Sequence, residues 1–193
     1  MQTNILWSGI EYNSLENCLV KTTDTGAEIN SVIVGGYDGK IYHVEYQIRT
    51  NENWETIFVE IKSQHSNIRD YFIFESDAKG NWALNGKPED QFQGCIDVDI
   101  PVTPFTNTLP IKRLNMQKSE VSEIYVLYID LLERKITPVR QKYIRLADTR
   151  YHYENIPNDF EANIEVDEFG FVVDYPSLFT RTASVNSNFH NSR

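Results

Sequence analysis

The sequence predicts a single all-β domain, on three observations. Extended segments with alternating apolar and polar residues recur along the chain, as strands with one buried face require. Aromatic residues make up 12% of the 193 residues, led by 11 tyrosines, and such side chains favour half-buried sheet surfaces. No stretch keeps helical periodicity over three turns. Roughly ten to twelve short strands of this kind predict a sandwich, or a barrel that need not close.

The first half of the chain predicts two hairpins. In residues 41–49, Tyr42, Val44, Tyr46 and Ile48 share one face and polar residues occupy the other. A turn at residues 50–53 leads to a second strand at 54–62, which completes the first hairpin. Residues 70–76 and 81–84 form the second hairpin, with Gly80 placed for a positive φ angle.

The second half continues in the same way. Strands are expected at residues 123–132, 139–147, 151–154 and 161–166, and a turn then leads to residues 171–175 in a third hairpin. Pro138 is expected at a strand start or a bulge. Single helical turns are expected only at residues 14–18 and 112–117. The domain is expected to span residues 1–181, and residues 182–193, rich in Ser and Asn, to form a mobile tail.

Residues 97–114 have the most unusual composition in the chain. Three prolines, four Thr or Asn residues, two aspartates and a Lys-Arg pair lie within this segment. Prolines fix φ and bias the preceding residue toward extended backbone, which predicts a stiff, irregular, non-helical segment. We expect Thr103, Thr106, Asn107 and Thr108 to bond to neighbouring backbone groups. Apolar residues would anchor the segment in the core: Phe105, Leu109, Ile111 and Leu114.

Charge and hydropathy exclude several classes of function. The formal net charge is −10, whereas nucleic-acid binding calls for a basic surface and docking on anionic membranes calls for basic clusters. No apolar run approaches the ~18 residues of a transmembrane helix, and the first residues lack the pattern of a signal peptide. We therefore expect a cytoplasmic protein without a transmembrane segment.

Common catalytic and metal-binding motifs are missing from the sequence. Gly35-Gly36 lacks the helix and Lys of a phosphate loop, and no G-x-S-x-G elbow is present. Cys18 and Cys95 lack C-x-x-C spacing and are expected to be free, buried thiols. The four histidines lack metal-ligand spacing. We expect no metal and no cofactor.

Asp97 and Asp99 are the candidate reactive pair. Under strand geometry the two carboxylates project to the same side, about 7 Å apart. They could act as acid and base, as in glycoside hydrolysis, or bind a divalent cation, alone or with Asp130. The alternative is structural, with the carboxylates capping backbone groups or pairing with Arg113. This interpretation is favoured because no nucleophile or base stands beside them.

Tyrosines on alternating positions suggest a second kind of site. Tyr143 lies near Arg145, and Tyr151 lies near Tyr153, each pair two residues apart. The simpler interpretation is core packing with the hydroxyls at the rim. The alternative is a curved sheet whose concave face holds an amphipathic ligand, with rings stacked on a sugar or acyl chain and polar groups bonded to its head group.

Several motifs, taken in order, resemble one known family. They include Trp7 with Gly9, Ser14-Leu15-Glu16, the Gly80-Asn81-Trp82 turn, the run TPFTNTLPIKRL at 103–114, and DYPSLF at 174–179. The chain resembles, from about residue 7 to residue 181, the bacterial family labelled "putative glycolipid-binding". The resemblance implies a strongly curved antiparallel sheet that forms an unclosed barrel, similar to periplasmic lipoprotein carriers, with the segment 97–114 packed on it. The expected cytoplasmic location would rule out periplasmic transport.

Three functions follow as hypotheses. The first is non-catalytic binding of an amphipathic small molecule, such as a glycolipid, on the concave face of the sheet. The second is an enzyme that uses Asp97 or Asp99 with Arg113, and the third is an interaction module with an exposed sheet edge. The sequence leaves the oligomeric state open. The residues expected to bind a ligand are Asp97, Asp99, Thr103, Asn107, Arg113, Tyr143, Arg145 and Tyr151.

Overall fold

The computed structural model describes residues 1–187 and shows fifteen strands in one sheet. The first eight strands are β1 Gln2–Gly9, β2 Ser14–Thr23, β3 Gly26–Tyr37, β4 Lys40–Thr50, β5 Thr56–His65, β6 Ile68–Ser76, β7 Trp82–Leu84 and β8 Lys87–Pro88. The remaining strands are β9 Asp97–Asp99, β10 Val121–Asp130, β11 Lys135–Ala147, β12 Arg150–Ile156, β13 Glu161–Val166, β14 Val172–Tyr175 and β15 Phe179–Ser187. Helices are few and short: η1 Asp90–Phe92, η2 Phe105–Asn107 and α1 Thr108–Leu114.

The chain starts in the middle of the sheet and returns there. Strands β1 to β8 run outward in sequence order, and residues 89–96 then lead to β9 at the opposite edge. Strands β10 to β15 run back inward until β15 pairs with β1. All neighbours are antiparallel except β9 and β10. The edge strands β8 and β9 are not paired with each other, so the barrel is unclosed.

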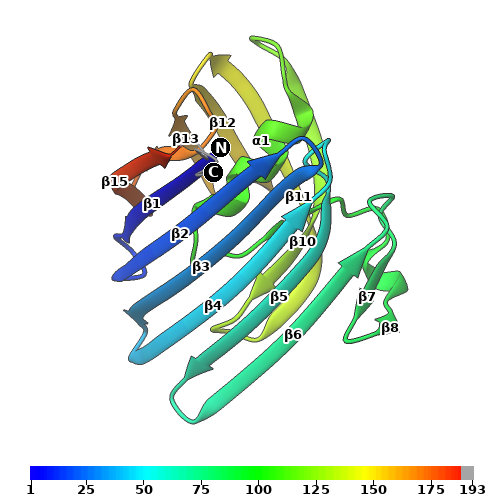
Figure 1. Cartoon of the computed structure of the whole chain (residues 1–193), viewed down its shortest axis with the longest axis vertical. Helices are drawn as coiled ribbons and strands as arrows, with labels where there is room; N and C mark the ends of the chain where they lie inside the picture. The colour runs from blue at the N-terminus through cyan, green and yellow to red at the C-terminus, as the bar shows by residue number, and fades with distance from the viewer. Residues whose placement is uncertain (188–193) are drawn as a thin grey trace, which may run out of the picture.

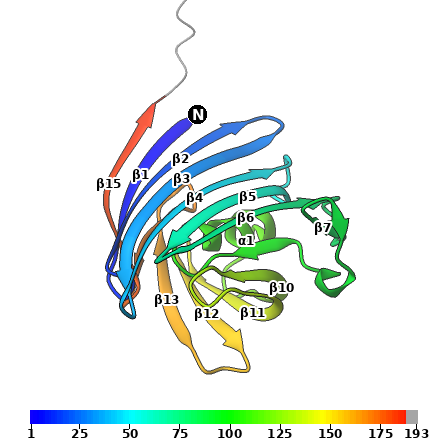
Figure 2. The same ribbon diagram turned by 90° about the horizontal axis from the view of Figure 1, so that it is seen from below.

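Strong curvature wraps the sheet around its own interior. In β4 buried and exposed residues alternate, with Tyr42, Val44, Tyr46 and Ile48 facing inward as the sequence predicted. Register shifts interrupt the pairing of several strands, for example at Leu6/Trp7 in β1. Such bulges bend strands and increase their twist. Figure 2 shows α1 enclosed between the β1–β6 half and the β10–β13 half of the sheet.

The segment 97–114 fills the space between the two halves of the sheet (Figures 1 and 2). Phe105 and Leu109 are fully buried, and Ile111 is 5% exposed, as expected for anchors, whereas Leu114 is only partly buried. The prediction that the segment is non-helical is wrong, because η2 and α1 lie within it. Pro110 is tolerated as the third residue of α1, since backbone N–H groups in the first helical turn have no intrahelical partner.

Side-chain bonds to the backbone hold this segment, as predicted for three of the four residues. Thr103 accepts a bond from the Phe105 N–H, Thr106 accepts one from the Ile100 N–H, and the Asn107 amide donates to the Pro104 carbonyl. The Thr108 hydroxyl is buried and has no hydrogen-bond partner within residues 1–187.

Most expected strands are present, and the differences from the expectation are confined to a few segments. Residues 14–18, expected as a helical turn, belong to β2, where Ser14, Glu16 and Cys18 face inward. Strands β1 and β3 were not predicted, because Thr3 and Ser31 interrupt their apolar, inward faces. Pro138 lies inside β11, opposite Leu127. Residues 182–187, expected in the tail, continue β15 and pair with β1. The rest of the expected tail, 188–193, lies outside the described residues.

Candidate functional site

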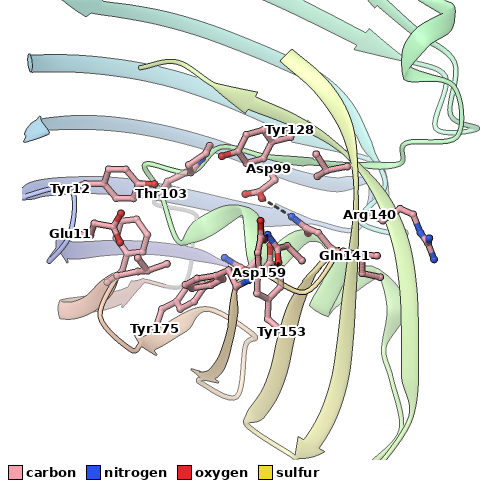
Figure 3. Close-up of a pocket in the computed structure, with 18 of the residues that line it drawn as sticks. Glu11, Tyr12, Asp99, Thr103, Tyr128, Arg140, Gln141, Tyr153, Asp159 and Tyr175 are labelled. Carbon is pink, nitrogen blue, oxygen red and sulfur yellow. Dashed lines mark hydrogen bonds between the residues drawn. The ribbon is translucent and has the colours of Figure 1, made fainter. Parts of the chain in front are cut away.

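A cavity of about 520 Å³ opens on the concave side of the sheet, beside the segment 97–114 (Figure 3). Strands β9 to β12, β14 and β15 contribute to its wall, together with η2 and the connecting residues 11–12, 101–103, 157–160 and 178. The lining residues are Glu11, Tyr12, Asp99, Pro101, Thr103, Asn107, Tyr128, Lys135, Val139, Arg140, Gln141, Tyr153, Asn155, Ile156, Pro157, Asp159, Phe160, Tyr175, Leu178 and Phe179.

Four tyrosines line this cavity, which we call the tyrosine pocket: Tyr12, Tyr128, Tyr153 and Tyr175. They come from the β1–β2 turn, β10, β12 and β14, so strands far apart in sequence supply the rings. Tyr153 and Tyr175 pack edge to face with ring centroids 6.2 Å apart, and Tyr12 stacks on Phe179 at 5.7 Å. Edge-to-face and offset packing is favourable between aromatic rings. The pocket wall is therefore built of mutually supporting rings.

Three of these four tyrosines have hydroxyls that are available to a ligand. The hydroxyls of Tyr12, Tyr153 and Tyr175 make no hydrogen bond within residues 1–187, and none of them is closed off from the pocket. Burial raises the pKa of each of the four hydroxyls, and the Asp99 carboxylate adds to the rise. All four therefore remain protonated at neutral pH and can donate hydrogen bonds.

Asp99 is the carboxylate at the base of the pocket (Figure 3). The Gln141 amide donates to one carboxylate oxygen at 2.6 Å, and the Thr106 hydroxyl donates to the other at 3.1 Å. Burial raises the pKa of the Asp99 carboxyl, and these two hydrogen bonds oppose the rise. Both donors are neutral. Asp99 is thus fixed in position without a positive charge beside it.

Asp97 lies two residues earlier in β9 and has a different partner. Its side chain is fully buried and accepts bonds from Arg113 Nε at 3.1 Å and from Arg113 Nη2 at 2.5 Å. Burial raises the pKa of the Asp97 carboxyl, and the Arg113 guanidinium opposes that rise. This forked contact is the strongest geometry for a carboxylate and an arginine. Neither residue lines the pocket.

A third buried carboxylate, Glu16, lies behind Thr103. The hydroxyls of Ser31, Tyr46 and Thr103 all donate to its Oε1, at 2.7, 2.7 and 2.9 Å. Its Oε2 is buried without a partner in residues 1–187. Burial raises the pKa of Glu16 to about 7, although the three hydroxyls act against the rise. Glu16 therefore joins β2 to a residue of the pocket wall.

The structure brings together only part of the predicted site. Asp99, Thr103 and Asn107 line the tyrosine pocket, and Tyr143 lies behind it with its hydroxyl donating to Asn107 at 3.0 Å. The other predicted residues do not line it. The Asp97–Arg113 pair lies within the core, Tyr151 is 5% exposed in a neighbouring apolar cluster, and Arg145 bonds to backbone carbonyls, including that of Met116.

Residues missed by the sequence analysis supply most of the pocket, notably Tyr12, Tyr128, Tyr175 and Gln141. Tyr153 was noted for its spacing from Tyr151. The alternation of side chains along a strand also places Tyr128 of β10 and Tyr175 of β14 on the inward face. Alternation does not show which inward side chains face a cavity and which contact other packed side chains.

The outer face of β12 and β13 holds a different polar cluster. Ligand-type atoms of His152, Glu154 and Glu161 lie within 4.8 Å of one another, which the scattered spacing of the histidines did not predict. The Lys142 ammonium lies 2.9 Å from both oxygens of Glu154. Because Lys142 already neutralises Glu154, we interpret this cluster as an ion-pair network and not as a metal site.

Fold and pocket together define a single-domain, unclosed β-barrel with a tyrosine-lined cavity on its concave face. The family model described as "Putative glycolipid-binding" matches residues 4–181. This protein belongs to that family. None of the helices in residues 1–187 has the length and apolar character needed to cross a bilayer.

Two solved structures are similar to this chain. One is a DUF1089 family protein from Pseudomonas aeruginosa, with 32% identity, a TM-score of 0.77, and coverage of 86% of this chain and 91% of that chain. The other is a beta-barrel-like DUF1849 protein from Brucella abortus, with 9% identity, a TM-score of 0.52, and coverage of 95% and 96%. The second likeness concerns the fold alone. No curated protein matches this chain.

Proposed function

We propose that this protein binds an amphipathic small molecule without catalysis, and that the tyrosine pocket takes its head group. The observation that supports this most directly is the pocket itself. Its volume of about 520 Å³ lies within the ~300–1,000 Å³ range of small-molecule sites. Aromatic and apolar walls with a few converging polar groups are typical of such sites.

The wall chemistry suits a ligand with two kinds of surface. Val139, Ile156 and Phe160 offer apolar contact, and Asn107, Gln141 and the tyrosine hydroxyls offer hydrogen bonds. The family description supports a lipid-like ligand with a sugar head group. Tyrosine rings also stack on the apolar faces of sugars while their hydroxyls bond to sugar hydroxyls.

The enzyme hypothesis gains no support from the geometry. It needed Arg113 to act with Asp97 or Asp99, but Arg113 bonds to Asp97 away from the pocket, and Asp99 has only neutral donors. The pocket holds a fixed carboxylate with no activated nucleophile bonded to it. Binding is the function that this arrangement favours.

Octyl glucoside is a suitable probe below its micelle-forming concentration. Isothermal titration should show saturable binding to the wild type. Val139→Trp, which fills the pocket, should abolish it. Val121→Trp, at an exposed position on neighbouring β10, is the matched control and should bind like the wild type. Absence of saturable binding, or undiminished binding to Val139→Trp, would contradict the proposal. Native mass spectrometry of protein purified from its own host would then identify a co-purifying ligand.

A further inference from the structure

We propose that the tyrosine pocket selects a cationic head group, an alkylated ammonium, seated against Asp99 among the tyrosine rings. This inference rests on the proposed binding of an amphipathic molecule in the pocket, and it assigns a positive charge to the head group of that molecule. Three independent features of the described chain support it: the missing counter-ion of Asp99, the absence of cations over the pocket tyrosines, and the charge around the pocket mouth.

Asp99 differs in its partners from three other shielded carboxylates. Asp97 is paired with Arg113, Glu154 with Lys142 and Asp167 with Arg181. Asp99 forms no salt bridge within residues 1–187 and is held by Gln141 and Thr106 alone. A buried charge is strongly unfavourable unless it is paired. A ligand that brings a positive charge would supply the missing partner.

Glu16 also lacks a cationic partner, but its situation is different. Three hydroxyls donate to it, and it does not line the pocket. Asp99 lines the pocket, so a ligand can reach it. Of Glu16 and Asp99, only Asp99 is placed to contact a bound molecule.

Within the described residues, no Lys or Arg side chain lies over the ring of a pocket tyrosine. The cation–π contacts within the described residues involve Phe58, Tyr71, Trp54 and Tyr125, all outside the pocket. Ammonium groups bind over aromatic faces within about 6 Å of the ring centroid, and sets of rings recognise alkylated ammonium groups. Four rings around one carboxylate match that chemistry.

The charges at the pocket mouth also favour a cation. Glu11 and Asp159 line it with Lys135 and Arg140. Arg140 forms a salt bridge with Glu123, and Figure 3 shows its guanidinium directed away from the pocket. With Asp99 counted, carboxylates outnumber the free basic groups, and the whole chain has a net charge of −10. An anionic head group would be repelled both by Asp99 and by this surrounding field.

An alkylated ammonium fits better than a primary one. A primary ammonium is strongly hydrated and needs several acceptors to replace its water. The base of the pocket offers one carboxylate, whose oxygens already accept bonds from Thr106 and Gln141. Methylated nitrogen needs no hydrogen-bond acceptor and gains from ring contact and from a single negative charge.

The test compares three probes with the same octyl chain and different head groups: octyltrimethylammonium, octyl glucoside and octyl sulfate, each below its micelle-forming concentration. Isothermal titration at pH 7.5 should give octyltrimethylammonium the lowest Kd, at least about tenfold below that of octyl glucoside, with octyl sulfate weakest. A tenfold preference corresponds to about 1.4 kcal/mol.

Two Asp→Asn variants separate local recognition from general attraction to an acidic protein. Asp99→Asn should raise the Kd of octyltrimethylammonium at least about tenfold more than that of octyl glucoside, so that the preference for the cation is lost. Asp148→Asn removes the same charge from a side chain that is 95% exposed and should keep the preference. If both variants lose it equally, the attraction is general and the inference fails.

A measurement on the wild type tests the inference even if Asp99→Asn does not fold. Nuclear Overhauser contacts between the N-methyl protons of octyltrimethylammonium and tyrosine ring protons should appear, and Tyr12→Leu should weaken binding of that probe more than binding of octyl glucoside. Equal affinity for all three probes, or preference for the sulfate, overturns the inference and leaves the proposed function standing. Failure of all three probes to bind overturns both.

Discussion

Asp97 and Asp99 stand two residues apart in the three-residue strand β9 and have opposite surroundings. Asp97 faces the Arg113 guanidinium from the last turn of α1, at 2.5 Å, in the core. Asp99 faces the tyrosine pocket and is bonded by Gln141 of β11 and by Thr106. The first carboxylate has its positive partner within the protein, and the second does not. The same residue type therefore stabilises the fold at one position and faces a cavity at the other.

The comparison shows how one short segment can join structure to binding. The ion pair between Asp97 and Arg113 connects β9 to the end of α1, and so joins the two ends of the segment 97–114. This connection fixes the position of Asp99, whose oxygens are oriented by Thr106 and Gln141. A rigid supporting layer of this kind is what holds a binding group in place.

The largest expected effect on stability comes from removing the ion pair between Asp97 and Arg113. Arg113→Ala would leave a fully buried carboxylate without its partner and should destabilise the fold by about 3–5 kcal/mol, as measured by urea unfolding at pH 7. The double variant Asp97→Leu/Arg113→Met should recover most of this loss, because it removes both charges and keeps apolar volume. A single variant as stable as the wild type would contradict a structural role for the pair.

Glu16 is a third case to compare with Asp97 and Asp99. It is a buried carboxylate that has no basic partner and does not line the pocket. Its pKa is about 7 in the folded state against an ordinary value of 4.5, so the unfolded chain releases this proton first as the pH rises. Stability attributable to Glu16 should therefore fall between pH 4.5 and 7, by about 3 kcal/mol in total. Urea unfolding across this range should show that the wild type loses about 3 kcal/mol more than Glu16→Gln, which keeps the other buried carboxylates. Parallel curves would refute the assignment.

Asp99 should behave differently from Asp97 when its charge is removed. Asp99→Asn keeps the shape and an oxygen that can accept a bond, so we expect a change below about 1 kcal/mol at pH 4. Because burial raises the pKa of this carboxyl, the wild type should lose stability relative to Asp99→Asn as the pH rises from 4 to 7. Thermal melts at both pH values check this, and a loss of several kcal/mol in Asp99→Asn would contradict it.

The smallest effect is expected at the pocket mouth. The Arg140–Glu123 pair has side chains that are 45% and 51% exposed, and solvent screens such pairs. Arg140→Ala should cost about 0–1 kcal/mol, in contrast to Arg113→Ala. Urea unfolding at low and at 0.5 M salt would measure both variants. A loss at Arg140 equal to that at Arg113 would remove the distinction between the surface pair and the buried pair.

Much of the fold could be predicted from local sequence, but the pocket could not. Alternation in residues 41–49 identified β4, its inward face and its hairpin partner correctly, because period-two patterning depends only on the strand itself. The pattern did not identify β1 and β3, where the polar residues Thr3 and Ser31 stand among the inward-facing positions. It also did not place Asp99 and Gln141 together, since 42 residues separate them along the chain.

The sequence by itself determined the all-β class, the inward faces of the regular strands, the anchoring of residues 97–114 by Phe105 and Leu109, and the family. These depend on periodicity, side-chain type and a run of residues specific to the family. Only the tertiary structure decided which of the two aspartates pairs with Arg113 and which one lines the pocket. The physical reason is that a carboxylate's surroundings are set by the strands and helix that pack against it, and here those are α1, β10 and β11, brought to β9 by the curvature of the sheet.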